Sequence, residues 1–367
     1  MTAPTLRTDI AIIGAGMAGA SLAAEIGDAA SVVLIEGEER PGYHATGRSA
    51  AFWSETYGGP AVQPLTTASA AFLQAGGFIS ARGCLHLAGP NGAAPLAALA
   101  AEFAGSPVQL DVVSPDEADR LIPGLRSDHG TALFERSCTD IDVAGLHAHY
   151  LARASKAGAV LQTDSRVIGL RRNDGLWDIE TTRGHILAQK LVNAAGAWAT
   201  TIAEMAGAAP IAITPYRRTV VQLVIDPPIP ADMPMLIDAE KRFYFKPEPG
   251  SRVWVSPHDE TPTPPCDAAP EEIDVAIAID RFEKAVDWRI VKRERAWAGL
   301  RSFAPDRAPV YGFDTHAEGF FWFAGQGGFG IQTAPAAAMI GAALVLGKML
   351  PEAVREIDVN RYSPARF

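Results

Sequence analysis

The stretch DIAIIGAGMAGASLAAEI, from Asp9 to Ile26, is the most informative part of the sequence for the architecture of the chain. Residues Thr8 to Ile13 form a short apolar, β-branched run that ends at a glycine, which is typical of a buried parallel strand. The small residues that follow predict a helix to about Ile26, and SVVLIE, from Ser31 to Glu36, predicts a second strand. These segments together predict a β-α-β unit.

The turn between the first strand and the helix carries the spacing G-x-G-x-x-G at Gly14, Gly16 and Gly19. Glycines at these positions allow a tight turn, a close approach of the backbone to a pyrophosphate, and close packing of helix on strand. The helix N-terminus, with Met17 and Ala18, supplies free N–H donors and positive potential. Glu36 ends the second strand, where a carboxylate can bind ribose hydroxyls and disfavours the 2′-phosphate of NADP. The pattern predicts a dinucleotide site and leaves both FAD and NAD open.

A second glycine-rich turn, FFWFAGQGGFGIQTAPAAAMIGAALV, lies near the end of the chain. A second loop that feeds a helix N-terminus can direct backbone amides at another part of a long cofactor. Its glycines also have packing uses, which is the simpler interpretation. Two such loops favour a buried, extended FAD over NAD.

The bulk composition excludes several classes of function. The chain has 367 residues, with 32 Lys and Arg against 42 Asp and Glu, a net charge of −10. Nucleic acid is therefore not an expected partner. Three scattered cysteines and eight unclustered histidines predict neither a disulfide framework nor a metal site. The glycine-broken N-terminal segment does not match a signal peptide, and no segment is long enough to span a bilayer, so we expect a soluble cytoplasmic protein.

Two domains are expected from the length and from changes of character along the chain. Nucleotide-domain patterns recur at 1–80, 142–210 and 305–367, with helices predicted at 142–159 and to about Gly347. Residues 81–141, which look less regular, and the strand-rich 211–304 lie between them. We therefore predict an α/β fold: a discontinuous Rossmann-type FAD-binding domain with an inserted, mostly antiparallel β substrate-binding domain.

Several further motifs are specific to a family. PGYHATGRSAA, LVNAAGAWA, FYFKPEPG, WAGLRSFAPD and GFFWFAGQGGFGIQT occur in order along nearly the whole chain. With them the chain resembles the D-amino-acid oxidase superfamily of FAD-dependent oxidoreductases, and within it the bacterial D-arginine dehydrogenases. The resemblance implies non-covalent FAD and oxidative deamination of D-amino acids. A hydride would pass from Cα to flavin N5, and the imino acid would hydrolyse to a 2-oxo acid and ammonia.

The resemblance also implies which residues form the site. The residues expected to bind the cofactor are Gly14, Gly16, Met17, Ala18, Gly19, Glu36, Gly47, Arg48, Ser49, Ala50, Ala51, Val167, Ala195, Gly196, Trp198, Arg301, Gly327, Gly328, Phe329, Gly330, Ile331, Gln332 and Thr333. The residues expected around the substrate are Phe52, Ser54, Tyr57, Cys84, Arg218, Met235, Ile237, Tyr244, Arg301, Gly328 and Gln332.

The chemistry of the guanidinium group also supports a role for the arginines in binding the substrate carboxylate. A guanidinium is always charged and offers a planar fork that matches a carboxylate. Arg301 lies among small and apolar residues, where an unpaired charge is costly, so it needs a ligand or a buried acid. Arg218 follows Arg217, and the pattern leaves open which of the two faces the site. The simpler alternatives are that the arginines only form structural ion pairs, and that Tyr57 and Tyr244 only pack in the core or a sheet.

Two departures from the D-arginine dehydrogenase pattern bear on the substrate. Cys84 stands where that family places a glutamate for the substrate guanidinium, and Phe52 replaces a histidine. With Met235 and Ile237, Phe52 makes the predicted pocket more apolar. We therefore expect neutral or hydrophobic D-amino acids to be better substrates than D-arginine.

Other functions remain open at this point. One is a flavin oxidase of glycine, sarcosine or another secondary amine, with oxygen instead of a quinone as electron acceptor. Another is a non-catalytic binding protein on the same fold.

Overall fold

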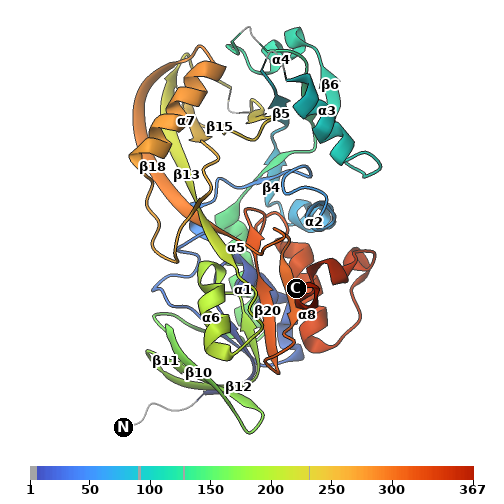
Figure 1. The fold of residues 1–367 in the computed structure, drawn as a ribbon, viewed down its shortest axis with the longest axis vertical. Helices are drawn as coiled ribbons and strands as arrows, with labels where there is room; N and C mark the ends of the chain where they lie inside the picture. Colours follow the sequence, from blue (N-terminus) through green and yellow to red (C-terminus); the bar gives the residue numbers. More distant parts are fainter. Residues whose placement is uncertain (1–5, 90–91, 127–128, 231) are drawn as a thin grey trace.

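A computed structural model describes residues 6–89, 92–126, 129–230 and 232–367, and it places them around two large sheets (Figure 1). In the view of Figure 1 the first sheet lies in the lower part and the second in the upper part. Across the described residues, no helix combines the length and the apolar character needed to cross a membrane.

The first sheet contains the predicted β-α-β unit. Its strands run in the order β10, β11, β12, β1, β2, β9, and β20 and β19 extend it beside β12. β1, β2, β9, β12 and β20 are parallel neighbours, whereas β10–β11–β12 form an antiparallel meander and β19 pairs antiparallel with β20. The bounds are β1 Leu6–Ile13, β2 Val32–Ile35, β9 Val160–Gln162, β10 Val167–Asn173, β11 Leu176–Thr181, β12 Gly184–Asn193, β19 Val310–Phe313 and β20 Phe320–Ala324.

Apolar clusters cover both faces of this sheet, because alternate residues of β1 point to opposite sides. Ile10 and Ile12 join the cluster formed with helices α1 (Met17–Ile26), α5 (Val143–Lys156) and α8 (Ala334–Leu346). Ala11 and Ile13 join the cluster on the other side with α6 (Ala199–Ala206). A sheet buried on both faces explains why β1 and β2 read as continuous apolar runs.

The second sheet is mostly antiparallel and is organised by two long neighbouring strands, β13 and β18, visible on the upper left of Figure 1. Its order is β21, β18, β13, β16, β15, β14, β5, β7, β6, with β17 beside β13. Among the described strands of this sheet, only β14 and β5 pair in parallel. The bounds are β5 Cys84–Leu87, β6 Asp111–Val113, β7 Ala132–Glu135, β13 Thr214–Asp226, β14 Met235–Asp238, β15 Tyr244–Glu248, β16 Arg252–Ser256, β17 Thr261–Pro262, β18 Arg289–Phe303 and β21 Gln326–Gly327.

The described residues also form four further α-helices, several short 3-10 helices, and a small third sheet of β3, β8 and β4. The helix bounds are α2 Gln63–Ala75, α3 Ala93–Glu102, α4 Pro115–Leu121 and α7 Glu272–Ala285, and the strand bounds are β3 Phe52–Trp53, β4 Ile79–Ala81 and β8 Thr139–Ile141. Helix α7 packs on β13 and β16.

The predicted fold class is confirmed, and the first strand, the first helix and the helices at 142–159 and near Gly347 lie where they were expected. The impression that residues 81–141 are less regular was wrong, because they contain β5 to β8, α3 and α4. β5 pairs with β14, about 150 residues away in sequence, so its short apolar run has no local partner that would reveal it.

Candidate functional site

A long cavity runs between the two sheets, along the carboxyl ends of β1 and β12. It is bordered by the segment after β2, the end of β18 and the second glycine loop. Of the predicted site residues, its lining includes Gly14, Gly16, Met17, Ala18, Glu36, Arg48, Ser49, Ala50, Ala51, Phe52, Tyr57, Ala195, Gly196, Trp198, Arg218, Tyr244, Arg301, Gly327, Gly328, Gly330, Ile331 and Gln332.

The first glycine loop is packed too closely to accept side chains. Gly14 has φ +100°, and a Cβ there would lie 2.4 Å from the carbonyl oxygen of Ala194. A Cβ on Gly19 would lie 1.9 Å from the carbonyl oxygen of Gly14, so Gly19 sets the packing of α1 rather than the cavity wall. The result is a cradle of bare backbone at a helix N-terminus, which fits a pyrophosphate.

Glu36 lies at this cradle, at the end of β2. One carboxylate oxygen accepts from the backbone N–H of Ala15 at 3.0 Å, and the other accepts from the N–H of Glu38 at 3.0 Å. An ionised carboxylate has about four acceptor positions, so hydroxyls of a ribose can still be bound. Val167, also predicted for the cofactor, is instead buried against Val33 and Ile35, outside the lining.

The segment after β2 links the cofactor loop to the second sheet. The Arg48 guanidinium donates to the carbonyls of Ala268 at 2.9 Å and Ala298 at 3.2 Å and forms an ion pair with Asp267. Gly47 does not line the cavity, because it packs against Gly42, whose carbonyl oxygen would be 2.7 Å from a Cβ.

The second glycine loop closes the far end of the cavity. Phe329 and Thr333 belong to this loop region but do not line the cavity. Phe329 packs with Val62 and Phe303, and the Thr333 hydroxyl donates to the carbonyl of Phe329 at 2.9 Å. The Gln332 amide is held by the backbone of Ser54, as acceptor and donor at 3.2 Å each. It also donates to the Tyr57 carbonyl at 3.0 Å and to Thr66 Oγ1 at 2.8 Å. Gln332 therefore fixes the segment that carries Tyr57, with its amide already bonded.

The structure answers which of the two neighbouring arginines faces the cavity. Arg217 forms ion pairs with Glu271 and, at 3.0 Å, Asp274 of α7. Arg218 lines the cavity. Burial and the nearby Arg301 lower the pKa of Arg218 to about 10, so its guanidinium stays charged at neutral pH. Arg218 is thus the predicted site residue, and Arg217 has the structural role.

Arg301 reaches the same part of the cavity from β18. Its Nη2 donates to the Tyr57 hydroxyl at 2.5 Å. A Cβ on Gly328 would lie 1.9 Å from the same nitrogen, so a side chain there would displace the guanidinium from this position. The second glycine loop and the Arg301 side chain are therefore in direct contact, and the position of each depends on the other.

Three aromatic rings converge beside the arginines. The ring centroid of Phe52 lies 4.9 Å from that of Tyr57 and 5.8 Å from that of Tyr244. Burial raises the pKa of Tyr244 well above its usual value, so its hydroxyl keeps its proton. The remaining predicted substrate residues, Cys84, Met235 and Ile237, belong to the same buried apolar cluster but lie behind the cavity lining. Burial raises the pKa of the Cys84 thiol strongly, so Cys84 offers no negative charge to a cationic substrate.

Ser54 does not face the cavity. Its buried hydroxyl donates to the carboxylate of Glu135 at 2.8 Å. Glu135 is fully buried and also accepts from Thr56 Oγ1 at 2.7 Å, the N–H of Glu55 at 2.6 Å and His86 Nε2 at 3.3 Å. Burial pushes the pKa of Glu135 up, but the hydrogen bonds from His86, Thr56 and Ser54 outweigh it and hold the pKa below its usual value. The network anchors the turn that presents Tyr57.

We expect the substitution Glu135→Gln to lower the free energy of unfolding by about 2–4 kcal/mol at pH 7, because buried donors lose a charged acceptor. The folded pKa of Glu135 is depressed, so its contribution is present above the unfolded pKa and is lost as pH falls through the folded value. Urea unfolding should show the loss at pH 7 and a smaller one below about pH 4.5. Glu272→Gln, at an exposed ion pair with Arg293, should change stability by less than about 1 kcal/mol; equal losses would contradict the assignment.

Sequence reasoning missed His258, which follows β16. Its Nδ1 lies 2.6 Å from the carbonyl of Lys241 and must donate, because a carbonyl can only accept. Burial, and next the charge of Arg218, lower the His258 pKa well below its usual value, so the ring is neutral and Nε2 carries a lone pair. Nε2 has no hydrogen-bond partner among the described residues, and the ring packs 5.3 Å from that of Tyr244. An isolated histidine after a strand gives no sequence signal of this placement.

The described part of the chain contains no group of His, Cys, Asp and Glu that could hold a metal ion. Cys84, Cys138 and Cys266 are free thiols, of which Cys84 and Cys138 are buried and Cys266 is exposed.

Comparison with known proteins gives consistent matches. A family model described as FAD dependent oxidoreductase matches residues 9–344. Human mitochondrial dimethylglycine dehydrogenase is 31% identical over 141 residues, which is 37% of this chain, and the chain covers only 16% of that protein. Glycine oxidase of Pseudomonas aeruginosa is 28% identical over 268 residues, covering 70% of this chain and 68% of that protein.

Solved structures match over nearly the full length. Glycine oxidase from Geobacillus kaustophilus superposes with a TM-score of 0.85 at 22% identity, covering 99% of this chain and 100% of the other. L-Proline dehydrogenase from P. horikoshii superposes with a TM-score of 0.83 at 23% identity, covering 96% and 98%. At such identities these two matches bear on the fold alone.

Proposed function

The chain belongs to the family of FAD dependent oxidoreductases, and from this premise we propose that it oxidatively deaminates neutral or hydrophobic D-amino acids. The substrate would lose a hydride from Cα and a proton from nitrogen, and the imino acid would hydrolyse to a 2-oxo acid and ammonia. The single observation that carries the proposal is the pair Arg218 and Arg301 on one cavity with the two glycine loops.

FAD is the cofactor, and the cavity fits it. When bound, it supplies the acceptor for the hydride that leaves the substrate. The cradle at Gly14 and the acid at Glu36 would hold its pyrophosphate and ribose, and the second glycine loop would contact its ring end. We assign residues 1–80, 142–210 and 305–367 to the FAD-binding domain, and 81–141 and 211–304 to the substrate-binding domain.

The arginines would fix the substrate by its carboxylate. Two guanidinium groups that line one cavity can bind a carboxylate through charge-assisted hydrogen bonds. Tyr57, bonded to Arg301, and the buried hydroxyl of Tyr244 lie on the same wall. This anchoring would leave Cα free to face the cofactor.

The surroundings of Phe52 favour a neutral side chain. Phe52, Tyr57 and Tyr244 meet there, and the cluster behind them contains Met235, Ile237 and an uncharged Cys84. Glu135 lies opposite Cys84 on β7, but its carboxylate already accepts from Ser54, Thr56 and His86 and lies outside the cavity lining, so a cationic side chain would be buried without a free carboxylate partner. The preference for the D-enantiomer follows from the family resemblance of the sequence motifs.

A second candidate is oxidation of glycine, sarcosine or another secondary amine with oxygen as acceptor. It is favoured by the matches to proteins named dimethylglycine dehydrogenase and glycine oxidase. The crowding of three aromatic rings beside the arginines is also compatible with a small substrate. We propose a cytoplasmic protein whose electron acceptor is a quinone or oxygen.

Anaerobic mixing of the holoprotein with a panel of amino acids tests the proposal. We expect loss of the flavin absorbance near 450 nm, about tenfold or more faster with neutral D-amino acids than with D-arginine, since a lost charged partner costs about 1.5–3 kcal/mol. Sarcosine and glycine are the comparison for the second candidate, and peroxide release in air identifies oxygen as acceptor. If D-arginine is the best substrate by tenfold, or if no amino acid or amine bleaches the flavin, the proposal is wrong.

A further inference from the structure

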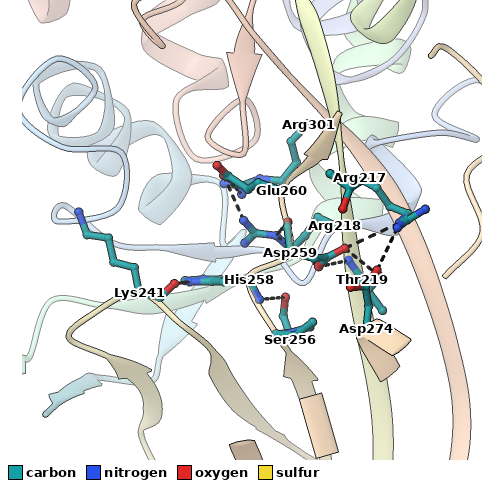
Figure 2. A network of polar contacts seen from close by, with 12 residues as sticks. Arg217, Arg218, Thr219, Lys241, Ser256, His258, Asp259, Glu260, Asp274 and Arg301 are labelled. Atoms are coloured by element: carbon teal, nitrogen blue, oxygen red, sulfur yellow. Dashed lines mark hydrogen bonds and ion pairs between the residues drawn. The ribbon is translucent and has the colours of Figure 1, made fainter. Parts of the chain in front are cut away.

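The turn between β16 and β17, residues 257–260, lies directly against the arginine pair (Figure 2). The carbonyl of Asp259 accepts from Arg218 Nε at 2.9 Å. The Asp259 carboxylate accepts from Thr219, from the backbone N–H at 2.7 Å and from the hydroxyl at 2.9 Å. The turn is therefore fixed to β13 at the residue that follows Arg218.

The next residue, Glu260, bridges both arginines through one atom. Its Oε1 accepts from Arg218 Nη2 at 3.2 Å and from Arg301 Nη1 at 3.3 Å. Figure 2 shows Glu260 beside Arg301, with a dashed contact toward the guanidinium of Arg218. Glu260 thus contacts two groups that come from different strands, β13 and β18.

Arg307 holds Glu260 from the other side. Its Nη2 donates to Oε1 at 2.9 Å and to Oε2 at 3.0 Å. The Arg307 guanidinium lies 3.9 Å from the ring centroid of Phe303, so aromatic contact supports it in turn. Both oxygens of Glu260 are therefore engaged, which favours a fixed side chain over a mobile cap.

The two site arginines need such a partner. Their side chains are only 10% and 12% exposed and carry like charges, which repel each other more strongly where water is excluded. Arg218 Nη2 and Arg301 Nη1 are bonded to Glu260, whereas Arg218 Nη1 forms no hydrogen bond to a described residue. A substrate carboxylate can then bind donors that already point into the cavity.

We propose that Glu260 is a positioning residue: its carboxylate holds the guanidinium groups of Arg218 and Arg301 together in the arrangement that binds the substrate carboxylate. The inference rests on the proposed function of that pair. It predicts that the loss of Glu260 weakens the binding of ligands that carry a carboxylate and leaves the binding of other ligands unchanged.

The test compares the holoenzyme with its Glu260→Gln variant on pairs of ligands that differ in that one group. The preferred amino acid and its α-amide give steady-state constants, and benzoate and benzamide give dissociation constants by calorimetry. We expect Glu260→Gln to raise KM for the acid and Kd for benzoate about 10- to 100-fold, the effect of losing a charge-assisted hydrogen bond, with kcat changed less than about threefold. The amide and benzamide should be unaffected, and Glu260→Asp, which keeps the charge, should recover part of the loss.

Glu318→Gln is the matched control, because Glu318 forms an exposed ion pair with Arg172 at 2.9 Å in the first sheet and lies outside the cavity lining. It should leave all constants unchanged. Tighter binding of benzoate by Glu260→Gln would show that Glu260 competes with the substrate, and equal losses for acid and amide would show a merely structural role; either result overturns the inference alone. A wild-type protein that neither oxidises amino acids nor binds benzoate overturns the proposed function together with it.

Discussion

Replacing Arg218 with methionine is expected to lower kcat/KM for the preferred amino acid by about 10²- to 10³-fold, because truncating one member of a desolvated, hydrogen-bonded charge pair costs roughly 2–5 kcal/mol. Methionine keeps much of the length and apolar stem of the side chain but removes the donors. The guanidinium of Arg301 would remain, so binding should be weakened and misaligned. Steady-state kinetics on the acid and its amide measure the effect, and only the acid should lose rate.

The neighbouring residue provides an unusually close control. Arg217 is also buried, at 7% exposure against 9% for Arg218, but it pairs with Glu271, the N-cap residue of α7, and with Asp274 in α7. Arg217→Met should therefore lower the melting temperature while leaving the ratio of acid to amide kinetics unchanged. If instead Arg217→Met abolished the discrimination and Arg218→Met did not, the assignment of the site arginine would be reversed.

The substitution Gly14→Ala is expected to yield protein without FAD, or no folded protein. The added Cβ would meet the Ala194 carbonyl oxygen at 2.4 Å, and the residue has φ +100°, which L-residues rarely adopt. Relief of the clash must move the backbone that forms the pyrophosphate cradle. The ratio of flavin to protein absorbance after purification measures retention, and we expect it to fall to less than about a tenth of the wild-type value, equivalent to a loss of more than 1.4 kcal/mol in binding.

The variant Gly27→Ala is the control for Gly14→Ala, because it introduces backbone strain at a positive φ without a steric clash. Gly27 ends the same helix with φ +59°, and nothing lies within 4 Å of a Cβ built there. Its ψ of −136° places it outside the left-handed helical region, in a conformation that residues with a Cβ rarely adopt, so the substitution should cost about 1–3 kcal/mol of stability, with FAD retained. Loss of FAD in Gly27→Ala, or full retention in Gly14→Ala, would show that steric closeness at the cradle does not control binding.

The parts of the fold that sequence could predict are those set by neighbours along the chain. β1, α1 and β2 follow one another, so apolar periodicity and glycine spacing locate all three. The helix α5 has an Asp142 N-cap, whose carboxylate accepts from the N–H of Gly145, and this signal is also local. β5 was missed because its partners β7 and β14 lie about 50 and about 150 residues away in sequence, and β6 pairs with β7 across the intervening helix α4 instead of a short hairpin turn.

Site residues were likewise predictable where a local motif marks them, and were not predictable where their role depends on contacts between distant segments. Motifs identified Arg218, Arg301 and Gly328, but not the close contact between Gly328 and Arg301, which joins the second glycine loop to β18 in space. Ser54 was placed beside the substrate, yet its hydroxyl turns to Glu135, about 80 residues further along the chain. Glu260 follows no motif, and its importance comes only from three guanidinium groups that folding brings around it.

The order in which strands enter the two sheets has a consequence for how the molecule can be divided. The chain contributes β1 and β2 to the first sheet, β5 to β7 to the second, β9 to β12 to the first, β13 to β18 to the second, β19 and β20 to the first again, and finally β21 to the second. Neither sheet is a contiguous piece of polypeptide. A single protease cut or a truncation therefore does not yield a fragment that contains all strands of one sheet and none of the other. The two sheets have to be synthesised and folded as parts of one chain.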